Sequence, residues 1–383
     1  MKSVRLFLLA LLAAAMFSCK PDDPYVPAEF SVGHGVFVLN EGDYQGGHAT
    51  LTFYDPEADT VINSLFKRVN FDLVQTLGDV AQSMAIIDGK LYIVVNNSNL
   101  IYKMDANTIR IDTTKPFKLL DFYSPREMHV VAPNKAYVSD LIGTNLWIIN
   151  PQDMTHTGTV EMGKTTEKMV QVGNELYVSN WSYYYVDANS HDSYTTVQVV
   201  DLNNDVKVAE IQVGKEPNCM AVDKNGHVWV LCEGRAWDED YGESPSLWEI
   251  DPMLKTAQCR VTFESVVDTI TATVTNYAST CMKSDPTGRY LYVVVSETAF
   301  GASSNSEIRR FDVDALTFSD SFSIASNENS YFYNMAVAPQ SGEIYVSCIS
   351  DGTMPGTVYR YTSDGVLLSS FAAGLFPSAM LFK

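Results

Sequence analysis

Positive charge is scarce in this chain, and its scarcity excludes one class of partner. The 383 residues include 26 lysines and arginines against 46 aspartates and glutamates, which gives a formal net charge of −20. Proteins that bind nucleic acid do so mainly by neutralising phosphates with clustered basic side chains. No stretch of the sequence forms such a basic stripe. We therefore expect no nucleic-acid partner.

Catalytic signatures are also missing. The sequence contains no G-x-S-x-G, H-E-x-x-H or phosphate-binding glycine loop, and its six histidines have no fixed partner spacing. The acidic run at residues 238–240, together with Glu243, lacks the alternating spacing of a calcium loop, so we interpret it as solvated surface charge. We predict that the protein is not an enzyme, with no catalytic residues, no metal site and no cofactor.

Only one long apolar run is present, and it lies at the N-terminus. Residues 6–17 (LFLLALLAAAMF) follow a short basic start and are too few to span a bilayer. We predict that residues 1–18 are a signal peptide, that Cys19 becomes the lipidated N-terminus, and that residues 19–30 form a tether. Lys20, Asp22 and Asp23 resemble the surface-export signal of Bacteroidetes lipoproteins. This resemblance implies an outer-membrane protein that is anchored only by its lipid and faces the cell exterior.

Cysteine is scarce in the rest of the chain. No pair has C-x-x-C or Cys/His zinc spacing, and an odd number of cysteines after export leaves at least one thiol free. Cys219 and Cys281 each precede a repeated methionine in neighbouring units, and Cys232 and Cys348 share a strand position. We interpret these cysteines as small, buried packing residues. The cysteines that follow Cys19 are Cys219, Cys232, Cys259, Cys281 and Cys348.

The sequence does contain a repeat. Spacings of 41 to 62 residues separate methionines that share one short sequence context, and periods of this size indicate a propeller or a solenoid. Methionine fills irregular gaps well, whereas a copper site would need sulfur ligands that converge on one point. We therefore expect these residues to pack between neighbouring units. The repeated methionines are Met84, Met128, Met169, Met220, Met282, Met335 and Met380.

Two landmarks follow six of these methionines. An aromatic residue leads an apolar strand eight to ten residues later, at Tyr92, Tyr137, Tyr177, Trp229, Tyr292 and Tyr345. A further strand then runs into a tight turn, which in most units begins at Asp or Asn, whose side chain bonds to the backbone. These turn residues are Asp105, Asn150, Asp201, Asp251 and Asp312. The pattern predicts short antiparallel strands joined by hairpins, with no crossover helix.

The two ends of the chain complete one another. GVFVLNEG around Phe37 and LTFYDPEA around Asp55 supply two strands of a unit that lacks its first strand, and the last eight residues, FPSAMLFK, can provide it. Such pairing closes a ring and protects its edges, whereas a solenoid needs capping repeats. We predict an all-β, seven-bladed β-propeller over residues 31–383, with four-stranded blades and the C-terminal strand paired with the N-terminal blade.

The candidate site follows from this fold. Loops that enter the first strand of a blade and loops that leave the second strand lie on one face, around the channel, and binding residues concentrate on such loops. Here they are rich in aromatic rings, amides and hydroxyls. Some of the rings would cover the blade tops, but together they suit a large, flat ligand. The candidate ligand-binding residues are Asn40, Tyr44, Asn97, Arg126, Asn180, Trp181, Tyr183, Arg235, Trp237, Tyr331, Phe332 and Asn334.

Two sequence features resemble known propellers. The strands YVSN, YVSD and YIVVNN resemble those of YncE-like, YVTN-type β-propellers. VLNEGDYQGGHATLTFYDPEAD, followed by LGDVAQSMAIIDGKLYIVVNNSN, is similar to the opening of Bacteroidetes propeller lipoproteins, a group that includes the BtuG-type cobalamin-binding surface lipoproteins. The resemblance covers essentially all of residues 31–383 and is strongest in the first two blades.

The resemblance implies a non-enzymatic receptor that captures cobalamin and delivers it to a TonB-dependent outer-membrane transporter. Asparagine amides would bond to the corrin rim, aromatic rings such as Tyr44 and Trp181 would cover its faces, and Arg126 or Arg235 would bind its phosphate. Two alternatives stay open. One is an accessory module that binds a glycan, a peptide or a protein partner; the other is a lactonase- or lyase-type propeller enzyme, which would need a metal or a His/Glu set at the channel.

Overall fold

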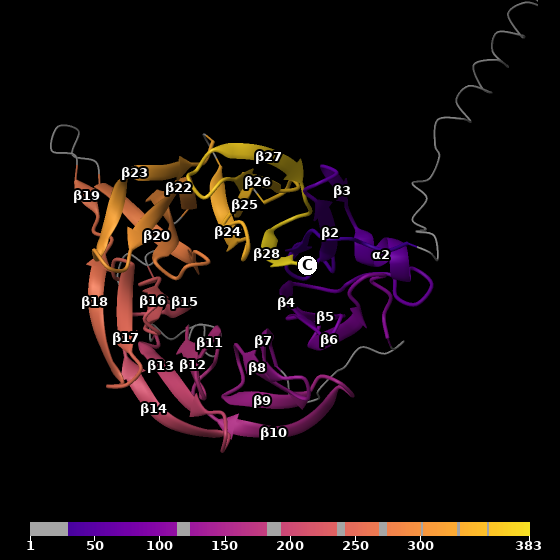
Figure 1. Ribbon diagram of the computed structural model, residues 1–383, viewed down its shortest axis with the longest axis horizontal. Helices are drawn as coiled ribbons and strands as arrows, with labels where there is room; N and C mark the ends of the chain where they lie inside the picture. Colours follow the sequence, from indigo (N-terminus) through magenta and orange to yellow (C-terminus); the bar gives the residue numbers. More distant parts are fainter. Residues whose placement is uncertain are drawn as a thin grey trace, which may run out of the picture.

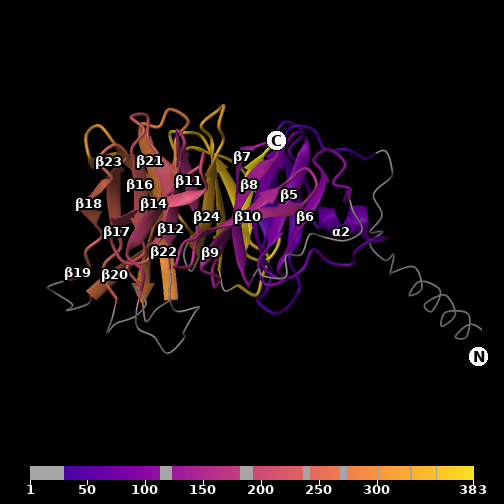
Figure 2. The ribbon, with the colours of Figure 1, turned by 90° about the horizontal axis from the view of Figure 1, so that it is seen from below.

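The chain folds into a closed ring of seven antiparallel β-sheets (Figure 1). The structure, a computed structural model, describes residues 30–112, 123–181, 193–235, 242–267, 274–299, 302–327, 330–350 and 352–383. We number the sheets as blades 1 to 7 in chain order. Seen from the side, the ring is a disc (Figure 2). The prediction of an all-β, seven-bladed propeller is confirmed.

Blade 1 combines the two ends of the chain. Its strands lie in the order β28 (Pro377–Phe382), β1 (Val36–Asn40), β2 (Thr50–Asp55) and β3 (Thr60–Ile62). Strand β28 is the innermost strand, and it pairs antiparallel with β1 so that Met380 lies opposite Val38. The predicted closure of the ring by the C-terminal strand is therefore confirmed.

The strands of the other blades are ordered from the channel outward, except for the short first strand of blade 6, which lies at the outer side of the ring (Figure 1). Blade 2 contains β4 (Ala81–Ile87), β5 (Lys90–Val95) and β6 (Leu100–Asp105). Blade 3 contains β7 (Pro125–Ala132), β8 (Lys135–Asp140), β9 (Asn145–Asn150) and β10 (Thr155–Glu161). Blade 4 contains β11 (Met169–Val172), β12 (Glu175–Asn180), β13 (Thr196–Asp201) and β14 (Val206–Gln212). Blade 5 contains β15 (Pro217–Val222), β16 (Val228–Cys232), β17 (Ser246–Asp251) and β18 (Thr256–Thr262). Blade 6 contains β19 (Val266–Val267), β20 (Val274–Ser284), β21 (Tyr290–Ala299), β22 (Ala302–Asp312) and β23 (Thr317–Ala325). Blade 7 contains β24 (Tyr331–Val337), β25 (Ile344–Ile349), β26 (Thr357–Tyr361) and β27 (Leu367–Ala372).

Five of the seven blades have the predicted four strands. Blade 2 has three strands among the described residues, and blade 6 has five because the short β19 pairs with the start of β20. Helix α2 (Leu65–Asn70) lies between blades 1 and 2. Within the part of the chain that the structure describes, no helix is both long and apolar enough to cross a membrane.

The turns form as their sequence predicts. The Asp105 carboxylate accepts hydrogen bonds from the backbone N–H groups of Asn107 and Thr108, both at 3.0 Å. Asp251 accepts the equivalent bonds from Met253 and Leu254 at 2.8 and 3.0 Å. An acidic side chain at the end of the third strand therefore stabilises the turn that follows it.

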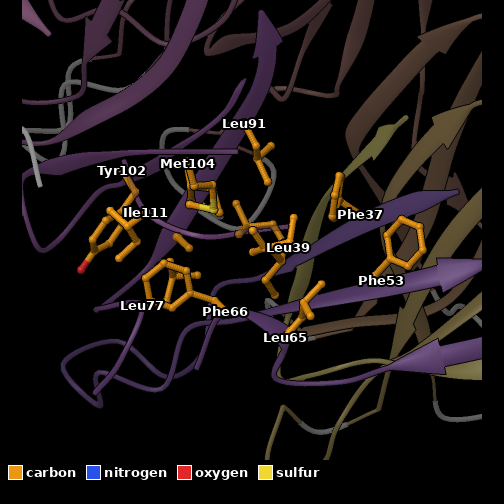
Figure 3. Packing of buried hydrophobic residues seen from close by; sticks show 14 of the residues in the cluster. Phe37, Leu39, Phe53, Leu65, Phe66, Leu77, Leu91, Tyr102, Met104 and Ile111 are labelled. Carbon is orange, nitrogen blue, oxygen red and sulfur yellow. The ribbon is translucent and has the colours of Figure 1, made fainter. Parts of the chain in front are cut away.

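The hydrophobic core is divided among the seams between blades. Each of seven clusters of buried side chains joins two neighbouring blades. Figure 3 shows the cluster between blades 1 and 2, where Phe37 and Leu39 of β1 face Leu91 and Met104, with Phe66 of α2 beside them. Because every seam is a small core, a single ring of about 350 residues needs no large central core.

The repeated methionines lie in these seams, as predicted. Each is on the innermost strand of its blade and packs toward the preceding blade; Met282 and Met335 are fully or almost fully buried. The aromatic residue of the second strand packs toward the following blade, and in several blades its polar group also bonds there. The Tyr92 hydroxyl, for example, donates to the Pro151 carbonyl of blade 3 at 2.8 Å.

Candidate functional site

The loops predicted to gather on one face do lie together. In blades 1, 2, 3 and 5, the loop that leaves the second strand bonds to the segment that enters the first. Glu41 N–H donates to the Phe376 carbonyl at 2.9 Å, and Glu233 N–H donates to the Glu216 carbonyl at 3.0 Å. We call this side of the disc face A. Two adjoining cavities open on it.

The channel-mouth cavity has a volume of about 300 Å³ and lies where the innermost strands begin. Its wall is polar and ionisable and includes the side chains of Glu41, Lys168, Glu233, Cys219 and Asn218. The residues that line it are Glu41, Gln82, Lys168, Trp181, Asn218, Cys219, Glu233, Ala278, Thr280, Ser296, Tyr331, Phe332, Tyr333, Asn334 and Ser378.

The side pocket has a volume of about 490 Å³ and lies over blades 1 to 3. Its rim carries two exposed rings, Tyr44 at 71% and Tyr123 at 63% exposure, and the exposed apolar side chain of Ile142. The residues that line it are Glu41, Gly42, Tyr44, Val80, Asn96, Asn97, Tyr123, Ser124, Arg126, Leu141, Ile142, Tyr333 and Phe376.

Glu41 and Tyr333 belong to both cavities and join them. The Tyr333 hydroxyl donates to Glu41 Oε2 at 2.6 Å, and the Tyr333 ring packs on Phe376 with centroids 5.6 Å apart. Burial raises the pKa of Glu41 above its ordinary value, and burial together with the Glu41 carboxylate raises the pKa of Tyr333. A short hydrogen bond therefore holds a carboxyl group and a phenol at the border between the two cavities.

Arg126 is the fixed cation of the site. Its Nε and Nη2 donate to the two carboxylate oxygens of Glu167 at 2.7 and 2.9 Å, and its Nη1 donates to Gln82 Oε1 at 2.7 Å. Its guanidinium also lies 5.8 Å from the ring centroid of Trp181. The bidentate geometry and the buried Glu167 hold Arg126 rigidly between blades 2, 3 and 4.

Glu233 is the second unusual carboxyl group. Asn218 Nδ2 donates to its Oε1 at 2.6 Å. Burial raises the pKa of Glu233 to about 8, and this hydrogen bond offsets only part of that effect. At neutral pH the group is mostly a carboxylic acid that can donate a proton to a ligand acceptor.

Seven of the twelve predicted ligand-binding residues line the cavities. Tyr44, Asn97 and Arg126 line the side pocket. Trp181, Tyr331, Phe332 and Asn334 line the channel mouth. Phe332 is 2% exposed and belongs mainly to the core between blades 6 and 7, and the Asn334 amide is bonded to the Ser378 carbonyl and the Met335 N–H.

Three predicted residues lie elsewhere, and the ligand role proposed for them is corrected. Asn40 and Asn180 are fully buried at the ends of second strands, where their amides bond inward; Asn40 Oδ1 accepts from Gly374 N–H at 2.9 Å, and Asn180 Nδ2 donates to the Thr165 carbonyl at 2.8 Å. Arg235 is also buried and lines neither cavity. Tyr183 and Trp237 lie outside the described residues.

Several lining residues were missed, and a bulge explains why. In β7 the pairing register shifts between Pro125 and Met128, and β4, β15, β20 and β24 have similar shifts just before or near the methionine. A bulge inserts a residue and re-aims the side chains around it. The residue two positions before each repeated methionine lines the channel mouth or belongs to the Arg126–Glu167 pair beside it. These residues are Gln82, Arg126, Glu167, Asn218, Thr280, Tyr333 and Ser378.

One group of side chains among the described residues has the composition of a cation site. Ligand atoms of Asp223, His227 and Glu249 lie within 4.8 Å of one another. These atoms already serve internal bonds, since Asp223 accepts from Trp229 Nε1 at 3.0 Å and His227 Nδ1 lies 2.5 Å from Glu249 Oε1. We therefore interpret these three residues as a hydrogen-bonded group that stabilises the turn between β15 and β16. The acidic residues 238–240 lie outside the described residues.

The sequence matches one family model. Residues 34–383 match a model described as a domain of unknown function, DUF5074. No curated protein matches the sequence.

Three solved structures with a similar fold are distant from this chain in sequence. A quinonprotein alcohol dehydrogenase-like protein from Bacteroides thetaiotaomicron is 16% identical, with 92% of this chain and 79% of that chain covered and a TM-score of 0.62. The periplasmic gluconolactonase of Pseudomonas aeruginosa is 12% identical, with 91% and 98% covered and a TM-score of 0.63. A protein from Lactobacillus plantarum is 12% identical, with 92% and 100% covered and a TM-score of 0.61. At these identities the similarity shows the fold alone.

Proposed function

This chain belongs to the DUF5074 family, a domain of unknown function, and from that premise we propose that it is a non-enzymatic receptor that captures cobalamin on face A. The ligand would lie over the side pocket and the channel mouth. The proposal rests on the resemblance of the first two blades to cobalamin-binding propeller lipoproteins and on the chemistry of these two cavities.

The observation that carries the proposal is the composition of the side pocket. The exposed rings of Tyr44 and Tyr123 stand beside the amide of Asn97 and the guanidinium of Arg126, around about 490 Å³ of space. Exposed aromatic rings around a cavity provide apolar contact area at low entropic cost, and polar groups between them fix a ligand's orientation. Cobalamin combines an apolar corrin face with a rim of amides and one phosphate, which matches this mixture.

The adjoining channel mouth adds hydrogen-bonding groups to the same surface. Glu233, as an acid, can donate to a ligand carbonyl, and Lys168 supplies a cation. Because Arg126 is already paired with Glu167, a ligand phosphate would approach the outer edge of a guanidinium whose charge is partly compensated. We therefore place the corrin over the side pocket and its amides toward the channel mouth.

The same proposal includes the location and the partner of the protein. A lipid on Cys19 would anchor the receptor in the outer membrane, facing outward, and residues 19–30 would act as the tether. The receptor would then pass cobalamin to a TonB-dependent transporter. The N-terminal sequence and the resemblance support this part of the proposal.

An enzymatic role has less support. Among the described residues that line the two cavities, no histidine is present, and the carboxyl groups of Glu41 and Glu233 are each bonded to neighbouring side chains. The gluconolactonase is similar in fold at 12% identity, and a fold alone does not carry a reaction.

The test is a titration of the purified protein with cyanocobalamin. We expect a ligand that is retained through desalting, a dissociation constant of about 1 µM or below by calorimetry, and quenching of Trp181 fluorescence. If no cobalamin is retained at that concentration, the cobalamin proposal is wrong. An affinity capture from outer membranes would then show whether face A binds a glycan, a peptide or a protein instead.

A further inference from the structure

A third cavity lies at the outer side of blade 1, where helix α2 packs against strand β2 (Figure 1). Its volume is about 280 Å³, and it shares no lining residue with the channel mouth or the side pocket. We call it the rim cavity. The residues that line it are Gly47, His48, Ala49, Thr50, Leu51, Ser64, Phe66, Lys67, Gln75, Thr76 and Leu77.

Three segments of the chain enclose the rim cavity. Residues 47–51, which lead into β2, form one wall, the start of α2 forms another, and residues 75–77 form the third. The Thr76 hydroxyl donates to the Gly47 carbonyl oxygen at 2.7 Å and so joins the first wall to the third. The cavity is therefore held in shape by bonds within the chain, as expected of a preformed ligand site.

The floor of the rim cavity is apolar. Leu51, Phe66 and Leu77 line it and belong to the buried cluster between blades 1 and 2. Figure 3 shows Phe66 and Leu77 close together in this cluster. A benzene ring fits an apolar cavity of about 150 Å³. The rim cavity therefore has room for an apolar group of that size together with a polar head group.

The exposed side chains of the rim cavity are hydrogen-bond donors. Lys67 is exposed, and no carboxylate of the described chain pairs with it. His48 Nδ1 lies 3.2 Å from Asp43 Oδ2, which leaves Nε2 as the ring nitrogen for a ligand. The Ser64 hydroxyl precedes α2 without capping it. Because Asp43 offsets any charge on His48, Lys67 is the cation of the cavity.

Positive charge without acidic neighbours is uncommon in this chain. The net charge is −20, yet no acidic residue occurs among the described residues that line the rim cavity. A cationic ligand would meet Lys67 with like charge. An inorganic anion alone would leave the apolar floor unused. An acidic group on an apolar body matches both parts of the cavity.

We propose that the rim cavity is a second binding site, which takes a small organic acid with one carboxylate or phosphate group on a short apolar body. Lys67 and Ser64 bind the acidic group, and His48 Nε2 adds a third donor. The apolar body lies on the buried floor. The site does not depend on cobalamin binding at face A, since the cavities of face A have no lining residue in common with it.

The experiment is an NMR titration of the folded chain with benzoate, followed through the signals of benzoate. We expect saturable binding with a dissociation constant of about 1 mM or below. Benzyl alcohol, which has the same ring but no charge, should bind about fivefold more weakly. Inorganic phosphate, which lacks the apolar body, should also bind more weakly than benzoate and should displace it at high concentration.

Two neighbouring basic residues on α2 provide a matched pair of variants. Lys67→Met should weaken benzoate binding about fivefold, because it removes the cation of the cavity. Lys67→Arg should retain most of the affinity. Arg68→Met removes the same charge from the next residue of the helix, which does not line the cavity, and should leave binding unchanged. A melting curve of each variant checks its folding.

Three results would overturn the proposal. One is benzoate that shows no saturable binding up to about 10 mM. Another is benzyl alcohol that binds as tightly as benzoate, since the cavity would then have no preference for an anion. The third is an equal loss of affinity in Lys67→Met and Arg68→Met, which would assign the binding to the general charge of the surface. The first two come from the unmodified chain and hold even if a variant fails to fold.

Discussion

Arg126 and Glu167 form a two-pronged ion pair across the seam between blades 3 and 4. The Nε–Oε2 and Nη2–Oε1 distances are 2.7 and 2.9 Å, and the side chains are 13% and 1% exposed. Both residues stand two positions before a repeated methionine. The pair is thus part of the set of polar side chains that stand two positions before the repeated methionines, around the channel mouth.

Removing the cation alone should destabilise the fold. We expect Arg126→Met to lower the free energy of unfolding by about 3 kcal/mol, because Glu167 would stay buried without a charged partner. Urea unfolding measures the change. A matched double variant, Arg126→Met with Glu167→Gln, should recover most of the loss. A loss below about 0.5 kcal/mol in the single variant would show that water replaces the guanidinium at no cost.

The exposed rings of the side pocket should contribute directly to ligand affinity. We expect Tyr44→Ala and Tyr123→Ala each to weaken cyanocobalamin binding by about tenfold, since each removes a contact ring at the pocket rim. Calorimetric titration gives the dissociation constants. Met253→Ala, at a 93% exposed residue in the turn after β17, is the matched control and should leave binding unchanged. Equal effects in all three variants would argue against the side pocket.

Stability should fall with rising pH because of Glu233. Burial raises its pKa from 4.5 to about 8, so between these values the unfolded chain has released a proton that the folded chain still holds. Rising pH then favours the unfolded state. The Glu233→Gln variant lacks this cost, and we expect it to be more stable than the wild type by roughly 1–3 kcal/mol at pH 8.5, with little difference at pH 4.5.

Denaturant unfolding at several pH values measures that difference. Glu57→Gln, at an exposed residue between β2 and β3, should change stability little at any pH. If the wild type and Glu233→Gln show parallel pH profiles, the Glu233 carboxyl group is solvated in the folded protein and the burial argument fails.

The last strand should be replaceable by a peptide. Deletion of residues 377–383 removes β28, which supplies the innermost strand of blade 1. We expect a large loss of thermal stability and early proteolysis of residues 34–62, because an open ring exposes strand edges and the seams beside blade 1. Adding the peptide FPSAMLFK should restore protection, whereas a scrambled peptide should not. An unchanged melting curve after deletion would show that closure is dispensable.

The sequence predicted the fold because a propeller repeats the same local sequence pattern in each blade. Seven methionine contexts, the aromatic strand leaders and turn residues such as Asp105 and Asp251 each mark a local structure, and local patterns of this kind need no knowledge of distant contacts. The closure was predictable as well, since blade 1 lacked a first strand and FPSAMLFK had no other place.

The site was predicted only in part. Loop position was enough to select Tyr44, Asn97 and Arg126. It failed for Asn40 and Asn180, whose polar side chains satisfy the backbone at the ends of their strands rather than face the channel. It also passed over Gln82, whose direction depends on a bulge in β4.

The sequence by itself determined the number of blades, their strand order and the closure of the ring, because these follow from periodic, local patterns. Only the tertiary structure decided which side chains share a cavity. The pairs Arg126–Glu167 and Tyr333–Glu41 join residues of different blades. Their contacts, their burial and the resulting pKa shifts arise where two blades meet. Bulges in the innermost strands also change the direction of nearby side chains, and a strictly alternating strand pattern does not predict these bulges.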